Sequence, residues 1–293
     1  MLAKVNDQPS DAPGDGGALS QFAPSAPVTG GRRIAAFFDL DKTIIAKSSA
    51  YAFGRQFVKS GLLSRSGVLQ MALGQMLYIS GGHDHEQMAA ARDQLASMVT
   101  GWKASTVRQI AEESLHSVIS PYVYSEAIDL IHHHQRLGHD VIIVSASATE
   151  VVEPIAETLE VDEVVATRLE VVDGRYTGEV PFFCRGANKG IELSRLSKER
   201  NYDLARSWAY SDSGTDVPML EVVGHPVAVN PDKYLRRIAE ERGWPIRDFR
   251  NPEPLYRDRQ RAMWIFGASA VGTASALVGV GSLLKALRKL RPE

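Results

Sequence analysis

Three short apolar segments, each followed directly by a polar cluster, stand out along the chain. They are Ile34 to Phe38, Val141 to Val144 and Trp208 to Tyr210, and the clusters that follow read DLDKT, SAS and SDSGTD. A short apolar run that ends at polar residues is typical of a buried strand whose carboxyl end opens onto a site. We therefore expect three strands whose polar ends converge.

The segments between these runs have mainly helical patterning. From Ser48 to Gln135, apolar residues recur at helical spacing, and Ile191 to Lys198 predicts a further helix. Leu169 to Val180 instead has strand patterning around Asp173-Gly174, a dipeptide suited to a tight hairpin turn. Strands that alternate with helices predict an α/β fold, a doubly wound parallel-sheet (Rossmann-like) core, with a helical insertion after the first strand.

The two ends of the chain differ from this pattern. The first 31 residues are rich in Pro, Gly, Ser and Ala and contain no apolar run of signal-peptide length, which predicts a disordered leader and no secretion signal. Near the other end, Met263 to Leu284 carries no charge. As a helix this segment would extend about 33 Å, enough to cross a hydrocarbon core of about 30 Å.

We therefore expect a C-terminal hydrophobic transmembrane helix and a membrane-associated protein, with the catalytic domain on the cytoplasmic side. An interfacial helix, or a helix docked on a partner, is the alternative, because many of its residues are Gly, Ala and Ser. Basic residues flank both ends of the segment, so the positive-inside rule gives no orientation.

Composition narrows the class of partner. The 293 residues are 44% hydrophobic and 23% charged, which leaves room for one large domain or two modest ones. The formal net charge of -2 gives no support to nucleic-acid binding. Cys184 is the only cysteine, which excludes an intrachain disulfide. Any function must come from local sites.

The polar clusters supply the groups that phosphate-ester hydrolysis needs: a nucleophile, a proton donor for the leaving oxygen and positive charge for the phosphoryl oxygens. Asp39 and Asp41 in DLDKT offer the first two within one short loop. Neighbouring carboxylates repel an incoming phosphate dianion, so a cation is required, and an oxygen-rich site suits Mg²⁺. Lys189, where a helix is expected to begin, adds a positive charge.

The arrangement resembles the haloacid dehalogenase superfamily, in particular subfamily IB, which contains the phosphoserine phosphatases. The resemblance spans roughly residues 33–250 and rests on four motifs in the correct order: DLDKT at 39–43, SAS at 145–147, Lys189 before a helix, and SDSGTD at 211–216. It implies an Mg²⁺-dependent phosphatase that hydrolyses a small-molecule phosphate monoester through an aspartyl phosphate.

Carried over by position, the resemblance assigns a role to each motif residue. Asp39 is the nucleophile, and Asp41 is the general acid and then the base. The remaining implied roles are phosphate binding by Thr43, Ser145 and Lys189, and Mg²⁺ binding by Asp39, Asp212 and the Asp41 carbonyl, with Asp216 in support.

The resemblance also implies domain boundaries. A hydrolase core is expected over residues 32–46 and 136–250, with a helical cap over residues 47–135 inserted after the first strand. The leader, residues 1–31, precedes this core. A linker over residues 251–262 leads to the expected transmembrane helix over residues 263–284. The sequence leaves the oligomeric state open.

Two positions concern the substrate. Phosphoserine phosphatases carry a Glu nine residues after the nucleophile that recognises the substrate's amino group, and this chain has Ser48 there. Arg92 is either the counterpart of the family's carboxylate-binding Arg or a surface residue. We therefore expect an amphiphilic or lipid-related phosphate, with phosphoserine, or a membrane-tethered protein that binds a phosphorylated ligand without catalysis, as alternatives. Transfer of the phosphoryl group to an alcohol uses the same residues.

Three consecutive histidines, residues 132–134, lie in a segment with helical patterning. Neighbouring helical residues point about 100° apart, so these side chains cannot bind one metal ion together. We expect them to form a solvated helix face.

Overall fold

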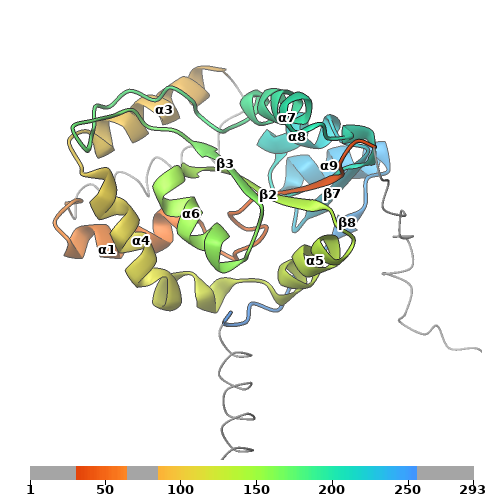
Figure 1. The fold of residues 1–293 in the computed structure, drawn as a ribbon, viewed down its shortest axis with the longest axis horizontal. Helices are drawn as coiled ribbons and strands as arrows, with labels where there is room; N and C mark the ends of the chain where they lie inside the picture. Colours follow the sequence, from red (N-terminus) through yellow and green to blue (C-terminus); the bar gives the residue numbers. More distant parts are fainter. Residues whose placement is uncertain (1–30, 65–84, 256–293) are drawn as a thin grey trace, which may run out of the picture. The chain divides into compact units, whose positions relative to one another are not determined.

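The computed structural model describes residues 31–64 and 85–255, and in these residues a six-stranded sheet forms the centre of the fold (Figure 1). The strand order is β3-β2-β1-β6-β7-β8, and every neighbouring pair is parallel. The expected doubly wound parallel sheet is thereby confirmed. The strands are β1 (Ala35–Phe38), β2 (Asp140–Ala148), β3 (Glu163–Thr167), β6 (Trp208–Ser211), β7 (His225–Val229) and β8 (Ile246–Arg247).

Strand β1 lies at the point where the strand order reverses. The chain runs outward from β1 through β2 to β3, then returns to the other side of β1 and continues through β6, β7 and β8. Ligands of open α/β sheets bind outside the carboxyl ends of the strands at such a point. The residue that follows β1 there is Asp39.

Helices cover both faces of the sheet. Successive residues of β1 point to opposite faces, and because all of them are apolar, both faces must be buried. Ala35 and Phe37 belong to a buried cluster with residues of α7, α8 and α9, whereas Ala36 and Phe38 pack with residues of α4, α5 and α6. Figure 1 shows α7 and α5 on opposite sides of the strands. The helices are α1 (Ser49–Lys59), α3 (His85–Val99), α4 (Ala104–Val118), α5 (Ser125–Arg136), α6 (Thr149–Thr158), α7 (Ala187–Arg200), α8 (Val217–Glu221) and α9 (Lys233–Arg242).

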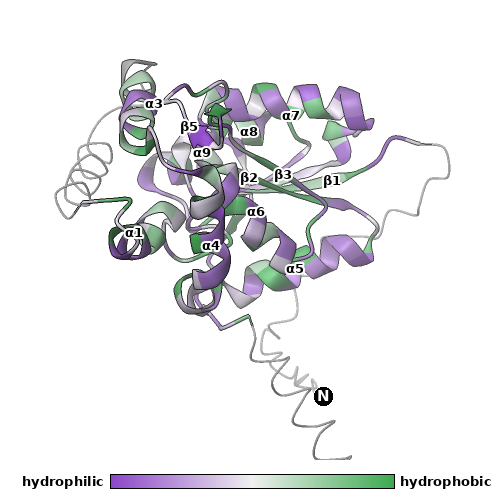
Figure 2. Ribbon diagram, turned by 60° about the vertical axis from the view of Figure 1, so that its left-hand side comes forward, coloured by the Kyte–Doolittle hydropathy of each residue, from purple (hydrophilic) through white to green (hydrophobic). Residues whose placement is uncertain are grey.

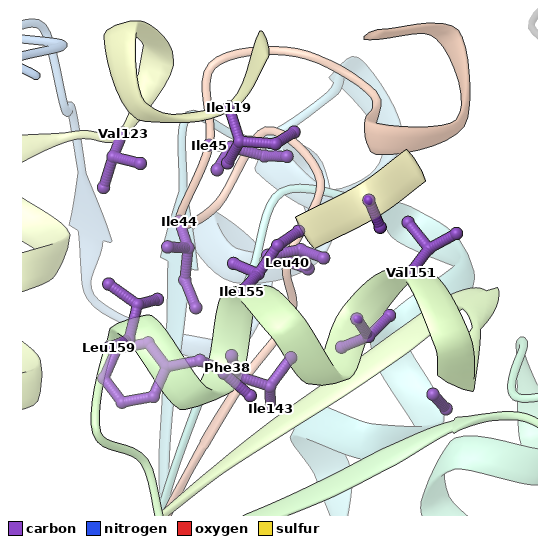
Figure 3. Packing of buried hydrophobic residues seen from close by; sticks show 14 of the residues in the cluster. Phe38, Leu40, Ile44, Ile45, Ile119, Val123, Ile143, Val151, Ile155 and Leu159 are labelled. Carbon is purple, nitrogen blue, oxygen red and sulfur yellow. The ribbon is translucent and has the colours of Figure 1, made fainter. Parts of the chain in front are cut away.

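The hydrophobic core beneath α6 fixes the loop that follows β1. In Figure 3, Ile155 of α6 lies beside Leu40, with Phe38, Ile143 and Ile44 around them. All five side chains are fully buried. Complete burial of such side chains contributes about 1.5–3 kcal/mol each to stability, so this loop is anchored on its apolar residues while its aspartates stay at the sheet edge.

Local sequence explains where the helices on the other face begin and end. Asp232 caps the N-terminus of helix α9, because its carboxylate accepts a hydrogen bond from the Leu235 N–H at 2.7 Å. Gly243, in the left-handed conformation, caps the C-terminus. Helix α7 ends at Asn201, which is also left-handed. Figure 2 shows hydrophilic and hydrophobic residues alternating along α7, as expected of a helix with one buried face.

The expected hairpin is confirmed as β4 (Val171–Val172) paired antiparallel with β5 (Arg175–Tyr176). Asp173 and Gly174 both have positive φ, 50° and 74°, as a tight two-residue turn requires. The Tyr176 main chain exchanges hydrogen bonds with the loop between α3 and α4. The hairpin is therefore joined to the helical insertion.

Helices α1, α3 and α4 lie between β1 and β2 in the chain, which confirms a helical insertion after the first strand. The division into a core over residues 32–46 and 136–250 and a cap over residues 47–135 stays a prediction. Of the predicted leader, residues 1–30 lie outside the described residues, as do residues 256–262 of the predicted linker.

The expected membrane localisation requires correction. In residues 31–64 and 85–255, none of the helices combines the length and apolar character needed to cross a bilayer. The longest helices in these residues, α3 and α4, have 15 residues each, and such a helix extends only about 22 Å. The segment 263–284, on which the expectation rested, lies outside the described residues.

The expectation for the histidines is also wrong for one of them. His134 on α5 is only 1% exposed, and its Nε2 lies 2.8 Å from the Tyr210 hydroxyl of β6. Its Nδ1 lies 2.9 Å from Nδ1 of His139, a ring that stacks on Trp208. The Tyr210 hydroxyl gives the imidazole a buried partner, which a pattern of polar residues along one helix cannot reveal.

The His134 cluster predicts a pH effect on stability. Burial, together with the charges of His139 and His133, lowers the pKa of His134 to about 3. Between about pH 6.5 and about pH 3, the unfolded chain therefore binds a proton at His134 that the folded chain does not. The free energy of unfolding falls as the pH is lowered through this range.

The free energy of unfolding should fall from pH 7 to pH 5 in both proteins. We expect the fall to be smaller in His134→Gln than in the wild type, by about 1–2 kcal/mol. Denaturant unfolding at both pH values measures the difference, and other titrating groups cancel because both proteins contain them. His132→Gln, at an exposed position of the same helix, is the matched control. Equal pH dependence in His134→Gln and the wild type would contradict the assignment.

Candidate active site

Asp39 is the first residue beyond β1, and its main chain continues the sheet through a 2.9 Å hydrogen bond from its N–H to the Tyr210 carbonyl. The chain then turns sharply, because the Leu40 carbonyl accepts hydrogen bonds from both Ile44 and Ile45. Lys42 within this turn has φ 60°, in the left-handed region. The turn keeps Asp39 and Asp41 at the same edge of the sheet.

Lys189 lies between two buried carboxylates. Its Nζ is 2.6 Å from Asp39 Oδ1 and 2.6 Å from Asp216 Oδ2, and all three residues are buried. An ammonium so placed joins β1 to the segment that follows β6. Asp39 and Asp216 lie 150 and 27 positions from Lys189 in the sequence. The three residues, all predicted from the sequence, thus form one ion-paired group.

Close packing of two helices sets the position of Lys189. A Cβ on Gly190 would lie 2.5 Å from the Pro218 carbonyl oxygen of α8, so only glycine allows α7 this close. The turn before α7 requires Gly186, which has φ 57°. These glycines bring the first turn of α7 against the segment that carries Asp216.

The SDSGTD segment holds Asp212 and Asp216 in different surroundings. Asp216 accepts hydrogen bonds from the Ser211 hydroxyl at 2.8 Å and from Lys189, so both of these partners face one carboxylate oxygen. Asp212 instead has Lys42 Nζ 3.9 Å from its Oδ2. Asp216 therefore orients Lys189, whereas Asp212 keeps its carboxylate available toward the Lys42 side of the site.

Asp41 receives a hydrogen bond at 2.8 Å from the Ser49 N–H to its Oδ1. Ser49 is the first residue of α1, so the start of the helical insertion holds this carboxylate. Burial raises the pKa of Asp41, and the Ser49 N–H partly offsets the rise. A carboxyl group with a raised pKa is suited to donate a proton.

The remaining two predicted residues supply hydroxyl groups. Ser145 is 1% exposed near the end of β2, next to β1 in the sheet, and its Oγ accepts a hydrogen bond from the Ser147 N–H at 3.2 Å. Thr43 is fully buried, and its hydroxyl has no hydrogen-bond partner within the described residues. Because buried polar groups are almost always paired, the Thr43 hydroxyl indicates a ligand oxygen.

The acidic residues of the site outnumber its cations. The pKa of Asp39 is raised to about 7, because burial and the Asp216 charge together outweigh the lowering effect of the Lys189 ammonium. Burial and the Asp39 charge also raise the pKa of Asp212 well above its ordinary value. The pKa of Lys189 is raised, because Asp216 and Asp39 outweigh the opposing effect of burial. The site is therefore short of positive charge.

This charge balance fits a divalent cation with oxygen ligands. In residues 31–64 and 85–255, no group of three or more His, Cys, Asp or Glu side chains has the arrangement of a metal site. A set of two carboxylates and one main-chain carbonyl, completed by water and substrate oxygens, needs only two such side chains. The donor types present therefore fit Mg²⁺.

Sequence reasoning missed several residues that position the site. Ser211 holds Asp216, and Gly190 admits α8 against α7. Asp232 joins the start of α9 to the site, because its N–H donates to the Asp212 carbonyl at 2.8 Å. Gly190 and Asp232 act through contacts with other segments, which one sequence does not reveal. Ser211 belongs to the SDSGTD cluster, but its bond to Asp216 depends on how that segment turns. Arg92, a candidate for substrate binding, is exposed on α3.

Residues 36–221 match the family described as haloacid dehalogenase-like hydrolase. Among curated proteins, the chain is 48% identical over 251 residues to a probable phosphatase of Mycobacterium tuberculosis, a match that covers 86% of each. It is also 48% identical over 257 residues to an inhibition of morphological differentiation protein of Streptomyces azureus, covering 85% of this chain and 92% of that one. A phosphoserine phosphatase of M. tuberculosis is 32% identical over 299 residues, covering 99% and 94%.

Two solved structures share the fold. A protein of unknown function from Bordetella pertussis matches with a TM-score of 0.66 and 29% identity, covering 74% of this chain and 99% of that one. A phospho-aspartyl intermediate analogue of phosphoserine phosphatase matches with a TM-score of 0.55, 19% identity and coverage of 80% and 99%. At that identity the second match concerns the fold alone.

Proposed function

This chain belongs to the haloacid dehalogenase-like hydrolase family and is a phosphoric monoester hydrolase, and on that premise we propose that it works through a phospho-aspartate at Asp39. The observation that carries the proposal is the 2.6 Å contact of Lys189 Nζ with Asp39 Oδ1. Thr43, in the loop that follows Asp39, adds a buried hydroxyl that has no hydrogen-bond partner among the described residues. A buried carboxylate, a fixed cation and a free hydroxyl are the groups that take up a phosphoryl group and its charge.

In the first step, an Asp39 carboxylate oxygen attacks phosphorus and the bond from phosphorus to the ester oxygen breaks. Asp41 gives its proton to that leaving oxygen. In the second step, Asp41 takes a proton from water, the water oxygen bonds to phosphorus, and the bond to Asp39 breaks to release phosphate. The raised pKa of Asp41 supports the first of these roles.

Lys189, Thr43 and Ser145 hold the phosphoryl oxygens in this proposal. Asp39, Asp212 and the Asp41 carbonyl would hold Mg²⁺, with Asp216 orienting Lys189 beside them. Bound Mg²⁺ would supply positive charge to the phosphoryl oxygens. The raised pKa of both Asp39 and Asp212 supports a cation there, because positive charge would restore their ionised forms.

The substrate class is a small phosphate monoester. Phosphoserine is favoured by the phosphoserine phosphatase relative that aligns with 99% of this chain. Ser48 argues against it, since a hydroxyl cannot pair a charged amine as a carboxylate does. The Ser48 side chain instead lowers the pKa of Asp41, so it acts on the proposed proton donor. That the substrate is an amphiphilic phosphate stays a hypothesis, which a panel of phosphate esters would test.

We expect phosphate release that requires Mg²⁺ and stops when a chelator is added. The assay would compare phosphoserine, a sugar phosphate, lysophosphatidate and p-nitrophenyl phosphate, each with Mg²⁺ and with chelator. Faster release from phosphoserine than from the other natural esters would overturn the argument from Ser48. An absence of release from every ester, with Mg²⁺ binding intact, would instead favour a protein that binds a phosphorylated ligand.

A further inference from the structure

Strand β2 contains an irregularity beside the site. Ser145 pairs with Ala166 of β3, but the next pairing joins Ala148 to Thr167, so Ala146 and Ser147 are two extra residues on β2. Thr167 holds this bulge through a 2.7 Å hydrogen bond from its hydroxyl to the Ala146 carbonyl. Bulges next to active sites redirect a side chain, and here that side chain belongs to Ser147.

The Ser147 hydroxyl contacts a segment 98 residues away in the chain. Its Oγ lies 2.7 Å from the Oγ of Ser49, which is fully buried at the start of α1. The main chain of Ser49 in turn donates to the Asp41 carboxylate at 2.8 Å. A continuous series of contacts therefore runs from the β2 bulge through the first turn of α1 to Asp41.

We propose that Ser147 and Ser49 form a positioning pair, in which the bond between their hydroxyls fixes the Ser49 N–H on the Asp41 carboxylate for proton transfer to the leaving oxygen. This inference rests on the function proposed above for Asp41. The Ser147 hydroxyl does not touch the reacting atoms, whereas Ser49 lowers the pKa of Asp41 through both its main-chain N–H and its side chain. Ser147 therefore acts through Ser49, and the bond between the two hydroxyls is the side-chain hydrogen bond that joins the first residue of α1 to the β2 loop in the described part of the chain.

The same series of contacts reaches the phosphate-binding side of the site. The Ser147 N–H donates to the Ser145 Oγ at 3.2 Å, so Ser147 links the expected phosphate ligand Ser145 to the start of α1. A displacement of about 1 Å in a reacting group is able to cost about 10²-fold in rate. Loss of one hydroxyl therefore affects catalysis through the placement of Asp41.

The test compares two leaving groups. An alkyl phosphate needs its leaving oxygen protonated, whereas p-nitrophenolate leaves as a stable anion, so only the first depends strongly on a placed acid. We expect kcat/KM for the alkyl ester to fall about tenfold in Ser147→Ala, with less than about a twofold fall for p-nitrophenyl phosphate. Ser147→Thr, which keeps a hydroxyl, should restore most of the loss. An equal fall on both esters, or none on either, would overturn the proposal.

A double substitution sharpens the test. Ser49→Ala keeps the main-chain N–H on Asp41 and removes both the bond to Ser147 and the Ser49 hydroxyl's own effect on Asp41, so Ser49→Ala/Ser147→Ala should be no slower than Ser49→Ala alone. Multiplied losses in the double variant would show that the hydroxyls act independently and would contradict the pair. Ser60→Ala, at the other end of α1 where the hydroxyl bonds only to the Phe57 carbonyl, is the control.

Two further variants separate this inference from the proposed function. Asp39→Asn should lose activity on both esters, and Asp41→Asn should lose kcat/KM selectively on the alkyl ester, because kcat/KM reports the first step and not the hydrolysis step that both esters share. If Asp41→Asn has the selective loss in kcat/KM and Ser147→Ala does not, the positioning pair alone fails. If Asp39→Asn stays active, or Asp41→Asn lowers kcat/KM equally on both esters, the proposed function fails and the pair with it.

Discussion

Substitution of Asp39 by Asn is expected to remove phosphate release, by at least about 10³-fold in kcat, without unfolding the protein. The amide has nearly the same shape but is not a nucleophile, so no bond to phosphorus forms. Its oxygen still accepts a hydrogen bond from Lys189, which also keeps Asp216 as an ionic partner. Steady-state phosphate release together with an unfolding curve measures both effects.

Asp93→Asn makes the same chemical change at an exposed position of α3 and should leave the rate unchanged. Comparable rates for Asp39→Asn and the wild type would exclude Asp39 as the nucleophile. A variant that is unfolded would have lost its activity for a different reason, which the unfolding curve identifies.

Substitution of Lys189 by Met is expected to have the largest effect on stability. Lys189 is the ammonium between the buried carboxylates of Asp39 and Asp216, and Met removes the charge while filling similar space. Removal of one partner from a buried ion pair costs about 3–5 kcal/mol, because the other charge stays buried without compensation. Phosphate release should fall as well, since the cation at the phosphoryl oxygens is gone.

The loss of stability in Lys189→Met should depend on pH in a defined direction. Lys189 lowers the pKa of Asp39, so its removal raises that pKa further above the unfolded value. The uncompensated carboxylate destabilises the fold at pH values above its folded pKa, and protonation relieves the cost as pH falls. We therefore expect a greater loss at pH 8 than at pH 6 by denaturant unfolding.

Lys198→Met, at an exposed position near the other end of α7, is the matched control and should change stability by less than about 0.5 kcal/mol. A Lys189→Met variant as stable as the wild type at pH 8 would mean that the ion-paired group does not hold the site together.

The sequence predicts the sheet where apolar runs are long enough to mark strands. The runs Ile34 to Phe38 and Trp208 to Tyr210 are observed as β1 and β6, because central strands bury mostly apolar residues, and β6 extends by one residue to the buried Ser211. Strand β2 continues through the polar SAS cluster to Ala148, because pairing with β3 keeps this segment extended. Strand β8 has only two residues and depends on pairing with β7, so nothing in its own composition marks it.

The residues of the candidate site could be predicted where the reactive side chains lie within a short motif. Asp39 and Asp216 come together because they follow neighbouring parallel strands, whose carboxyl ends lie at one edge of the sheet. Lys189 reaches both carboxylates from the first turn of α7. The hydrogen bond between Ser49 and Ser147 was not predictable, since it depends on a bulge that Thr167 of another strand holds in place. Long-range hydroxyl contacts leave no periodic pattern in a sequence.

The central claim is that Asp39 carries the phosphoryl group during turnover. The most direct measurement is rapid acid quenching of the wild-type enzyme during turnover of a phosphate ester with a labelled phosphoryl group, followed by peptide mapping of the label. The proposed mechanism predicts label on the peptide that contains Asp39, in a bond that hydroxylamine cleaves, and no label in Asp39→Asn. Label on a different residue, or turnover with no labelled protein at any quench time, would contradict it.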